Sequence, residues 1–423
     1  MTEIRLKRAL GALGSGLLSF NGVLGASIFA LPAALLVDWG SFSPFMFLIV
    51  GATALLVIIP FANSASVFPE SGGPAEYGLV YGRFAAFELG WVFYIARLAG
   101  FGANTNVLAD YVARWWSGAE EGIGRAVFIV AIWAAFTAVN IIGLRRAVRV
   151  LGGFTLLKTL PLLLVAGAAI ILLGPPPSPQ APVSIDKFEA GFLIIFYAFV
   201  GFENAVIPAG ETKNPKLTLP RALVGTTIVT ATLYFVVQLA FVTAFPDGAP
   251  EGTAPLVDMG RVVAGPIGAS VLTLAAICSL LGNLLAGAAA TPRVTYALAK
   301  RGDLPAWFAV VNPKFVSPAN SIVFIAVAAM ALSLTGSFVW LAVVSTLARM
   351  IVYIATIAAL PLTEGRPRLT ILHWVSGIAG IGICLWGVAQ AKSESWITLI
   401  ALSIVGLILY AVATRTLRTV KPA

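Results

Sequence analysis

Long apolar runs are the feature that most constrains this chain. A helix of about 20 apolar residues crosses the hydrocarbon core of a bilayer, which is about 30 Å thick. Such runs recur from one end of the sequence to the other, separated by short polar loops. We predict twelve membrane-spanning helices, at residues 12–36, 43–67, 84–115, 125–143, 153–174, 188–209, 221–245, 266–291, 321–334, 339–362, 372–391 and 395–414. The fold class that follows is an all-α polytopic membrane protein.

The composition excludes a water-soluble fold. Of the 423 residues, 59% are hydrophobic and 11% are charged, whereas soluble domains carry about 25% charged residues. So few charges cannot give a large domain a polar surface. The surroundings of this chain are therefore mostly lipid.

The basic residues indicate orientation rather than nucleic-acid binding. A net charge of +9 would favour nucleic acid only if the basic residues clustered on one folded face, and here they lie in the loops between spans. Loops rich in Lys and Arg stay in the cytoplasm. With the N-terminus inside, the opposite side holds only Arg114, Arg125, Lys187, Arg261 and Lys392. We therefore expect a multi-pass protein of the plasma (inner) membrane with both termini in the cytoplasm.

Few residues offer enzyme or metal chemistry. Cys278 and Cys384 both lie inside apolar runs, and His373 is the one histidine, so we expect neither a disulfide framework nor a metal site. No strand precedes the glycines of residues 11–16, which argues against a dinucleotide-binding turn. The sequence also lacks the phosphate-cradling loop of a pump and the carbonyl-rich filter of a channel. We expect no enzyme activity and no cofactor.

Glycine and proline gather in the middle of two spans. One cluster is residues 21–32 (NGVLGASIFALP) and the other is residues 196–208 (FYAFVGFENAVIP). Helical bonding inside a bilayer is given up only around a cavity or where neighbours replace it. Interrupted helices at corresponding positions of two halves are typical of transporters with inverted repeats. The alternative is that these glycines only allow close helix packing.

Two broken helices would suit a zwitterion. Freed amides point at an anion and freed carbonyls at a cation. We expect the amides of Ala26 and Ser27 to meet a carboxylate, and carbonyls near Val23, Tyr197 and Val200 to meet an ammonium group. The candidate substrate-binding residues in the two breaks are Val23, Gly25, Ala26, Ser27, Tyr197, Val200 and Gly201.

Several motifs resemble those of the amino acid-polyamine-organocation permeases. They are the glycine-rich first span, residues 68–77 (FPESGGPAEY), residues 210–216 (GETKNPK) and residues 293–305 after the eighth span. The resemblance covers about residues 11–318. It implies a five-plus-five inverted repeat with helices 1 and 6 interrupted, followed by two C-terminal helices. The implied parts are residues 1–175 and 176–363 for the two repeats, and 364–423 for the last two helices and the tail.

Lys158 lies inside the fifth span, where an ammonium group is costly without partners. In sodium-independent relatives of these permeases, a fifth-span lysine takes the place of a structural sodium ion. The resemblance implies that Lys158 bridges the Gly22 carbonyl in the broken first span and the hydroxyl of Ser279. The alternative is a lysine whose ammonium group extends to the cytoplasmic interface.

Glu203 also lies at membrane depth. It could accept a coupling proton, or it could hold the break in the sixth span by accepting hydrogen bonds from freed amides. Arg97, Asp110 and Arg349 are further charges within spans. The spacing of Arg97 and Asp110 argues against a direct pair on one helix, because helical neighbours are three or four residues apart. We interpret these three as structural or gating residues.

Resemblance to arginine/agmatine exchangers of the same family bears on the substrate. Tyr197 stands where these exchangers have a gating tryptophan, Phe101 where they have a polar residue, and Gly287 where they have another tryptophan. A neutral or apolar amino acid is therefore favoured over arginine. Tyr197 and Phe101 could instead be packing residues.

The expected function is secondary amino acid transport. We expect proton symport, with amino acid/amine exchange or export as the alternative. The expected partners are an amino acid, protons and the lipid bilayer, with no nucleic acid. A monomer and a homodimer both remain open.

Overall fold

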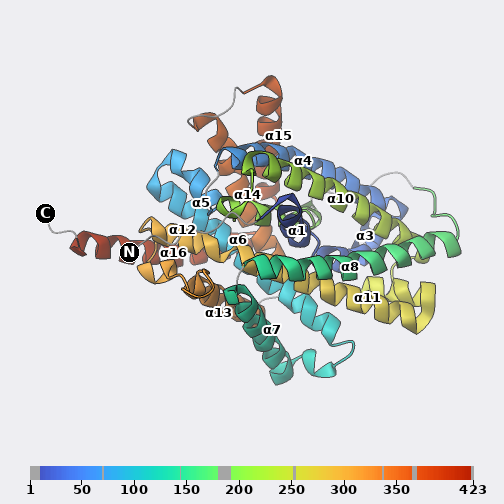
Figure 1. Ribbon diagram of the computed structural model, residues 1–423. Helices are drawn as coiled ribbons and strands as arrows, with labels where there is room; N and C mark the ends of the chain where they lie inside the picture. The colour runs from blue at the N-terminus through green and yellow to red at the C-terminus, as the bar shows by residue number, and fades with distance from the viewer. Residues whose placement is uncertain are drawn as a thin grey trace.

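All the regular secondary structure in the part of the chain that the structure describes is helical. The computed structural model describes residues 10–68, 71–142, 144–179, 192–250, 254–335, 338–363 and 369–420, without the side chains of 144–146, 338 and 416–420. Within these ranges there is no strand, and β-type pairing is limited to two isolated bridges, Leu10 with Thr212 and Asn312 with Ser317. Figure 1 shows the resulting bundle of helices.

The described ranges contain fifteen α-helices with defined bounds. They are α1 (Ala12–Val23), α2 (Ser27–Ala30), α3 (Pro32–Trp39), α4 (Ser43–Val67), α5 (Pro74–Tyr77), α6 (Arg83–Val112), α7 (Gly122–Ile142), α8 (Leu144–Leu172), α10 (Pro215–Ala244), α11 (Pro255–Ala290), α12 (Pro292–Lys300), α13 (Ala319–Thr335), α14 (Phe338–Ala359), α15 (Ile371–Ala389) and α16 (Ser393–Val420). Short 3₁₀ turns join them: η1 (Gly40–Phe42), η2 (Gly78–Tyr81), η3 (Ser117–Ala119), η4 (Phe202–Ala205), η5 (Ala209–Glu211), η6 (Ala306–Ala309) and η7 (Leu360–Leu362).

The protein is a polytopic membrane protein with about ten candidate spans. Ten helical segments of the described chain are long and apolar enough to cross a bilayer. The predicted sixth and ninth spans correspond instead to two shorter apolar helices, Phe192–Ala205 and Ala319–Thr335. The remaining ten predicted runs each coincide with one long segment.

Burial separates the inner helices from the outer ones. In the most apolar stretch of α6, 72% is buried inside the protein, and in that of the segment Pro255–Lys300 the buried share is 78%. In α15 and α16 the shares are 22% and 17%. Because lipid tails replace water around such a bundle, exposed leucines and isoleucines on the outer helices are expected. Figure 1 shows α1 and α6 near the middle of the bundle and α7 and α15 at its periphery.

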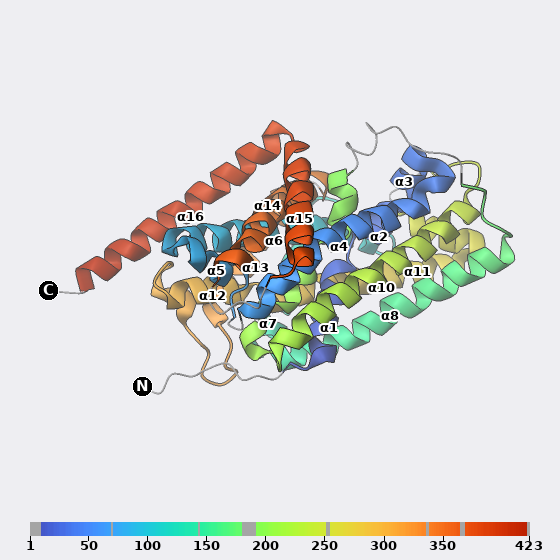
Figure 2. The same ribbon diagram turned by 90° about the horizontal axis from the view of Figure 1, so that it is seen from above.

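Helix packing brings the two halves of the chain together. Helix α10 packs against α4 and α8, α11 packs against α8, and α14 packs against α6. Figure 2 shows α4, α10 and α8 side by side. Helix α11 is kinked where Ala264 and Gly265 leave helical geometry, one residue before Pro266, which cannot donate a backbone hydrogen bond.

An ion-paired layer lies at one end of the bundle. The Arg83 Nε atom lies 2.5 Å from Asp303, whose other carboxylate oxygen lies 2.9 Å from Arg301. Arg301 also lies 3.1 Å from Glu76 of α5. These contacts join the starts of α5 and α6 to the loop after α12, and Figure 2 shows α5 and α12 together at this end.

Candidate functional site

The first helix break leaves backbone amides without acceptors. Helix α1 ends at Val23, and Leu24 turns away with ψ at 86° before α2 begins at Ser27. Among the described residues, nothing accepts a hydrogen bond from the N–H groups of Gly25, Ala26 and Ser27. Unpaired amides at a helix break attract an anion, so this backbone has free capacity for a carboxylate.

The second break lies against the first. Gly201 has φ of 107°, in the region that favours glycine. A Cβ added at Gly22 would overlap the Gly201 carbonyl, and a Cβ added at Gly201 would overlap the Gly22 carbonyl. The two interrupted segments therefore touch backbone to backbone, and this contact explains the glycine in each of them.

Lys158 of α8 reaches the first break. Its Nζ atom donates to the Leu24 carbonyl at 2.7 Å and lies 5.5 Å from the centre of the Phe20 ring. The Ser279 hydroxyl donates to the same carbonyl at 3.1 Å and to the Gly25 carbonyl at 3.3 Å. The structure thus brings the three predicted elements together but corrects the carbonyl, which is Leu24 rather than Gly22. The lysine is fully buried, whereas a snorkelling lysine would extend to the interface.

The Gly22 carbonyl begins a chain of side-chain hydrogen bonds. It accepts from the Asn283 side chain at 2.5 Å, and the Asn283 oxygen accepts from Asn104 at 2.6 Å. The Asn104 oxygen in turn accepts from the Tyr197 hydroxyl at 3.1 Å. This chain fixes Tyr197 relative to the first break. Our sequence analysis missed both asparagines, although an amide inside an apolar run is a recognisable signal.

Glu203 is the centre of a buried charge cluster. Its carboxylate accepts from Arg349 at 2.7 Å and from Arg97 at 3.4 Å. It also accepts from the Tyr353 hydroxyl at 3.1 Å and from the Gly201 N–H at 2.9 Å. The last contact is the hydrogen bond to a freed amide that one of our two interpretations of Glu203 predicted.

The other intramembrane charges have clear positions. Arg97 and Arg349 join Glu203, a grouping that the sequence did not indicate because the three are far apart in the chain. Asp110 pairs with Arg125 at 2.8 Å and not with Arg97, which agrees with the argument from helical spacing.

A small cavity lies between the breaks. It encloses about 20 Å³, which is room for about one water molecule. Eight of the nine predicted substrate-binding residues line it, together with Gly22 and five residues from other helices. The predicted residues are Val23, Gly25, Ala26, Ser27, Phe101, Tyr197, Val200 and Gly201, and the additional ones are Arg97, Gly100, Asn104, Asn283 and Arg349. In this conformation the cavity is too small to hold a whole amino acid.

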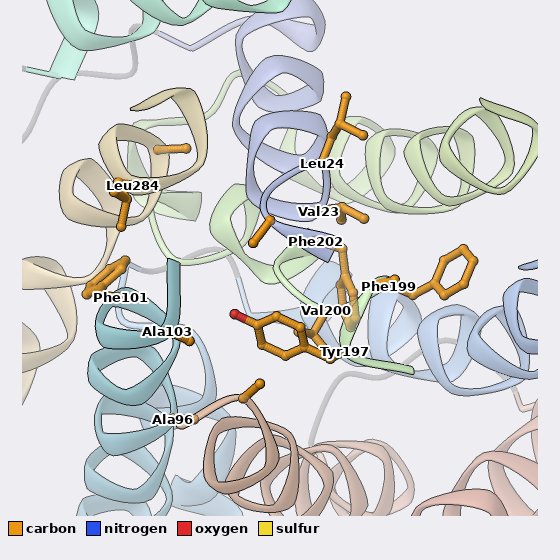
Figure 3. Packing of buried hydrophobic residues seen from close by; sticks show 14 of the residues in the cluster. Val23, Leu24, Ala96, Phe101, Ala103, Tyr197, Phe199, Val200, Phe202 and Leu284 are labelled. Atoms are coloured by element: carbon orange, nitrogen blue, oxygen red, sulfur yellow. The ribbon is translucent and has the colours of Figure 1, made fainter. Parts of the chain in front are cut away.

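Gly287, the ninth predicted residue, lies behind the cavity wall. A Cβ at Gly287 would overlap the Phe101 ring and the Arg97 guanidinium group. Its role in the structure is therefore to leave space for two lining side chains. Figure 3 shows Phe101 between α6 and Leu284 of α11, and Tyr197 with its hydroxyl directed toward α6.

Comparison with known proteins identifies similar sequences over nearly the whole chain. The family described as amino acid permease matches residues 10–418. An uncharacterized transporter of Mycobacterium tuberculosis is 28% identical over 86% of this chain and 82% of its own length. The branched-chain amino acid permease of Bacillus subtilis is 25% identical over 98% of this chain and 94% of its own. The serine/threonine exchanger of the same organism is 28% identical over 75% of each chain.

Proposed function

Because this chain belongs to the amino acid permease family, we propose that it is a secondary active transporter of amino acids in the plasma membrane. The observation that carries the proposal is the cavity between the two helix breaks, which the free amides of Gly25, Ala26 and Ser27 border. Relatives at about a quarter identity are named for branched-chain amino acids and for serine and threonine. This variety supports an amino acid as substrate without selecting one.

The proposed architecture has twelve spans. The ten long segments and the two shorter apolar helices make up this number. We propose two inverted repeats, residues 1–175 and 176–363, with 364–423 forming two further helices and a cytoplasmic tail. The mutual contact of the Gly22 and Gly201 backbones supports a pairing of the first helices of the two repeats.

The proposed substrate pose follows from the free backbone groups. The α-carboxylate lies on the amides of Ala26 and Ser27, and the ammonium group lies near the Val200 carbonyl of the second break. The Tyr197 carbonyl already accepts from the Val200 N–H at 3.3 Å, and the Val23 carbonyl accepts from the Tyr234 hydroxyl at 3.3 Å. A cationic side chain is disfavoured, because Arg97 and Arg349 line the same cavity and like charges repel strongly where water is excluded.

Coupling is proposed to depend on Lys158 and Glu203. Lys158 holds the Leu24 carbonyl in the first break, and Glu203 holds the Gly201 amide in the second. A change of charge on either group alters a contact within a break. Proton symport is therefore the first proposal and exchange of one amino acid for another is the second.

Uptake into liposomes tests the function and separates these two modes. Labelled amino acids of each charge class are offered to vesicles that contain the purified protein. Each is run with and without an inward proton gradient, and with and without unlabelled substrate inside. Gradient-driven accumulation supports symport, and uptake only into preloaded vesicles supports exchange. Uptake of no amino acid under any condition would refute the proposed function.

A further inference from the structure

The cavity carries more positive than negative charge. Arg97 and Arg349 are 4% and 3% exposed, and both pair with the fully buried Glu203. Within the described part of the chain, no second carboxylate contacts either arginine. A buried cation without an opposite charge costs several kcal/mol, so a further anion at this place would be strongly favoured.

Both arginines have unused donors. Arg97 donates through Nε to Thr291 and through Nη1 to Glu203. Arg349 donates through Nε to Glu203 and through Nη1 to Ser345 and to the Ala96 carbonyl. Among the described residues, the Nη2 atom of neither arginine donates a hydrogen bond. Both residues line the cavity, so a ligand there meets their guanidinium groups, and the Nη2 atom of Arg97 itself lies on the side of Gly287.

The backbone leaves room for the Arg97 guanidinium group, which a Cβ at Gly287 would overlap. A Cβ at Gly100 would make only an ordinary contact with Nη2 of Arg349, at 3.5 Å. The Phe101 ring lies 5.2 Å from the centre of the Arg97 guanidinium, an arrangement that stabilises a desolvated cation. The arginines are thus held in place beside the cavity, independently of any bound ligand.

We infer that the substrate is an acidic amino acid, with its side-chain carboxylate held by Arg97 and Arg349. This inference rests on the proposed function and names the substrate class. The α-carboxylate lies on the amides of Ala26 and Ser27, and the second carboxylate lies on the two guanidinium groups that line the same small cavity. Arginine is suited to this contact because its planar fork matches a carboxylate.

Charge balance separates this substrate from the alternatives. Counting Arg97, Arg349 and Glu203, the site holds one excess positive charge, which a side-chain carboxylate neutralises. A neutral amino acid leaves that charge uncompensated, and a cationic one adds to it. The neutral or apolar substrates that the sequence favours form the competing outcome of the test.

Uptake by the wild-type protein decides the substrate class. Vesicles containing the protein are offered labelled L-aspartate, L-glutamate, L-leucine and L-arginine at equal concentrations. We expect uptake of aspartate or glutamate, with leucine and arginine at least about tenfold slower. Uptake of leucine without uptake of either acid would overturn the inference and leave the proposed function intact. Uptake of none of the four, and of no other amino acid, would contradict the proposed function itself.

Variants of Arg97 decide whether this residue selects the acid. Arg97→Gln should lower aspartate uptake about 10- to 100-fold relative to leucine uptake, the effect of one charge-assisted contact. Arg97→Lys keeps the positive charge but lacks the planar pair of donors of a guanidinium group, so it should restore part of the aspartate uptake. Arg125→Gln, which removes a pair with Asp110 outside the cavity, is the matched control. If Arg97→Gln does not fold, a competition experiment on the wild-type protein still decides the substrate class. Unlabelled aspartate should then inhibit the uptake of labelled glutamate, and unlabelled leucine should not. An unchanged ratio of aspartate to leucine uptake in folded Arg97→Gln would refute the selecting role.

Discussion

At the scale of single residues, two glycines hold the breaks together. The Gly22 and Gly201 backbones approach so closely that a methyl group on either would meet the carbonyl of the other. We predict that Gly22→Ala abolishes transport, because the two segments must move apart to admit the methyl group. Gly16→Ala is the control on the same helix, since nothing lies within 4 Å of that added Cβ. Equal uptake rates for the two variants would contradict the prediction.

Lys158 is the second residue whose loss should be decisive. Its ammonium group holds the Leu24 carbonyl at 2.7 Å, in the turn between α1 and α2. We expect Lys158→Ala to reduce uptake to background while the protein still inserts into the membrane. Ser279→Ala, which removes a longer contact to the same carbonyl, should reduce uptake less. Uptake and the amount of inserted protein are measured on the same membranes, and wild-type uptake by Lys158→Ala would remove the lysine from the mechanism.

Residue types show why some site residues were predictable and others were not. Gly22, Gly25 and Gly201 were predictable because glycine in the middle of a membrane span indicates a break in the helix or a close backbone contact. The grouping of Arg97, Glu203 and Arg349 was not predicted. Arg97 and Arg349 lie 106 and 146 positions from Glu203, and no periodic pattern in the sequence links residues so far apart. Spacing along one helix correctly ruled out a pair of Arg97 with Asp110, but it cannot say which residue of another helix replaces it.

At the scale of elements, Glu203 joins three of them. It accepts hydrogen bonds from α6 through Arg97, and from α14 through Arg349 and Tyr353. Glu203→Gln removes the one anion between two buried cations, so we expect it to destabilise the protein by about 3–5 kcal/mol. Thermal unfolding in detergent measures this loss of stability. Glu120→Gln, which replaces an exposed acid, is the control. Equal melting temperatures of the two variants would contradict the structural role of Glu203.

The pH dependence of the same variant tests coupling separately. Glu203→Gln keeps most hydrogen-bonding capacity but removes the titratable group. If Glu203 carries the coupling proton, the dependence of uptake on external pH is lost in the variant. A pH profile with the wild-type shape and a lower maximum would assign Glu203 to structure alone.

The ion-paired layer fastens α5 and α6 to the loop after α12. The buried Asp303 carboxylate contacts both Arg83 and Arg301. We predict that Asp303→Asn weakens the closure of this end, so that a cysteine introduced at the neighbouring Ala75 reacts faster with a thiol reagent. Asp247→Asn, a change of an exposed loop acid, should leave that reaction rate unchanged. Similar rates in both variants would show that the ion pairs do not control access.

At the scale of the whole molecule, run length predicted the membrane spans well. Ten apolar runs correspond to ten long helical segments, because a bilayer requires helices that satisfy their own backbone. The sixth and ninth runs correspond to shorter apolar helices, and the structure describes the sixth only from residue 192 onward. In the sixth, regular helix ends at Tyr197, and a turn leads to Gly201, whose φ is 107°. The division at residues 175 and 363 stays a prediction, because no local signal marks a repeat boundary.

Orientation is a further property of the whole molecule. The basic loops predict that the end with α5 and α12 faces the cytoplasm. In a protein with Cys278 and Cys384 replaced by alanine, Lys314→Cys should react with an impermeant thiol reagent only from the inside. Glu120→Cys should react only from the outside. The reverse pattern would contradict the predicted orientation.

The most direct test of the account is protection of one residue in the cavity. Ser27 lies at the start of α2 and lines the space between the breaks. In the same cysteine-free background, Ser27→Cys is labelled with a thiol reagent in vesicles, with and without an amino acid that this variant still transports. The account predicts that the transported amino acid slows labelling and that an amino acid that is not transported has no effect. Equal labelling rates in the presence and absence of the transported amino acid would place its binding site elsewhere.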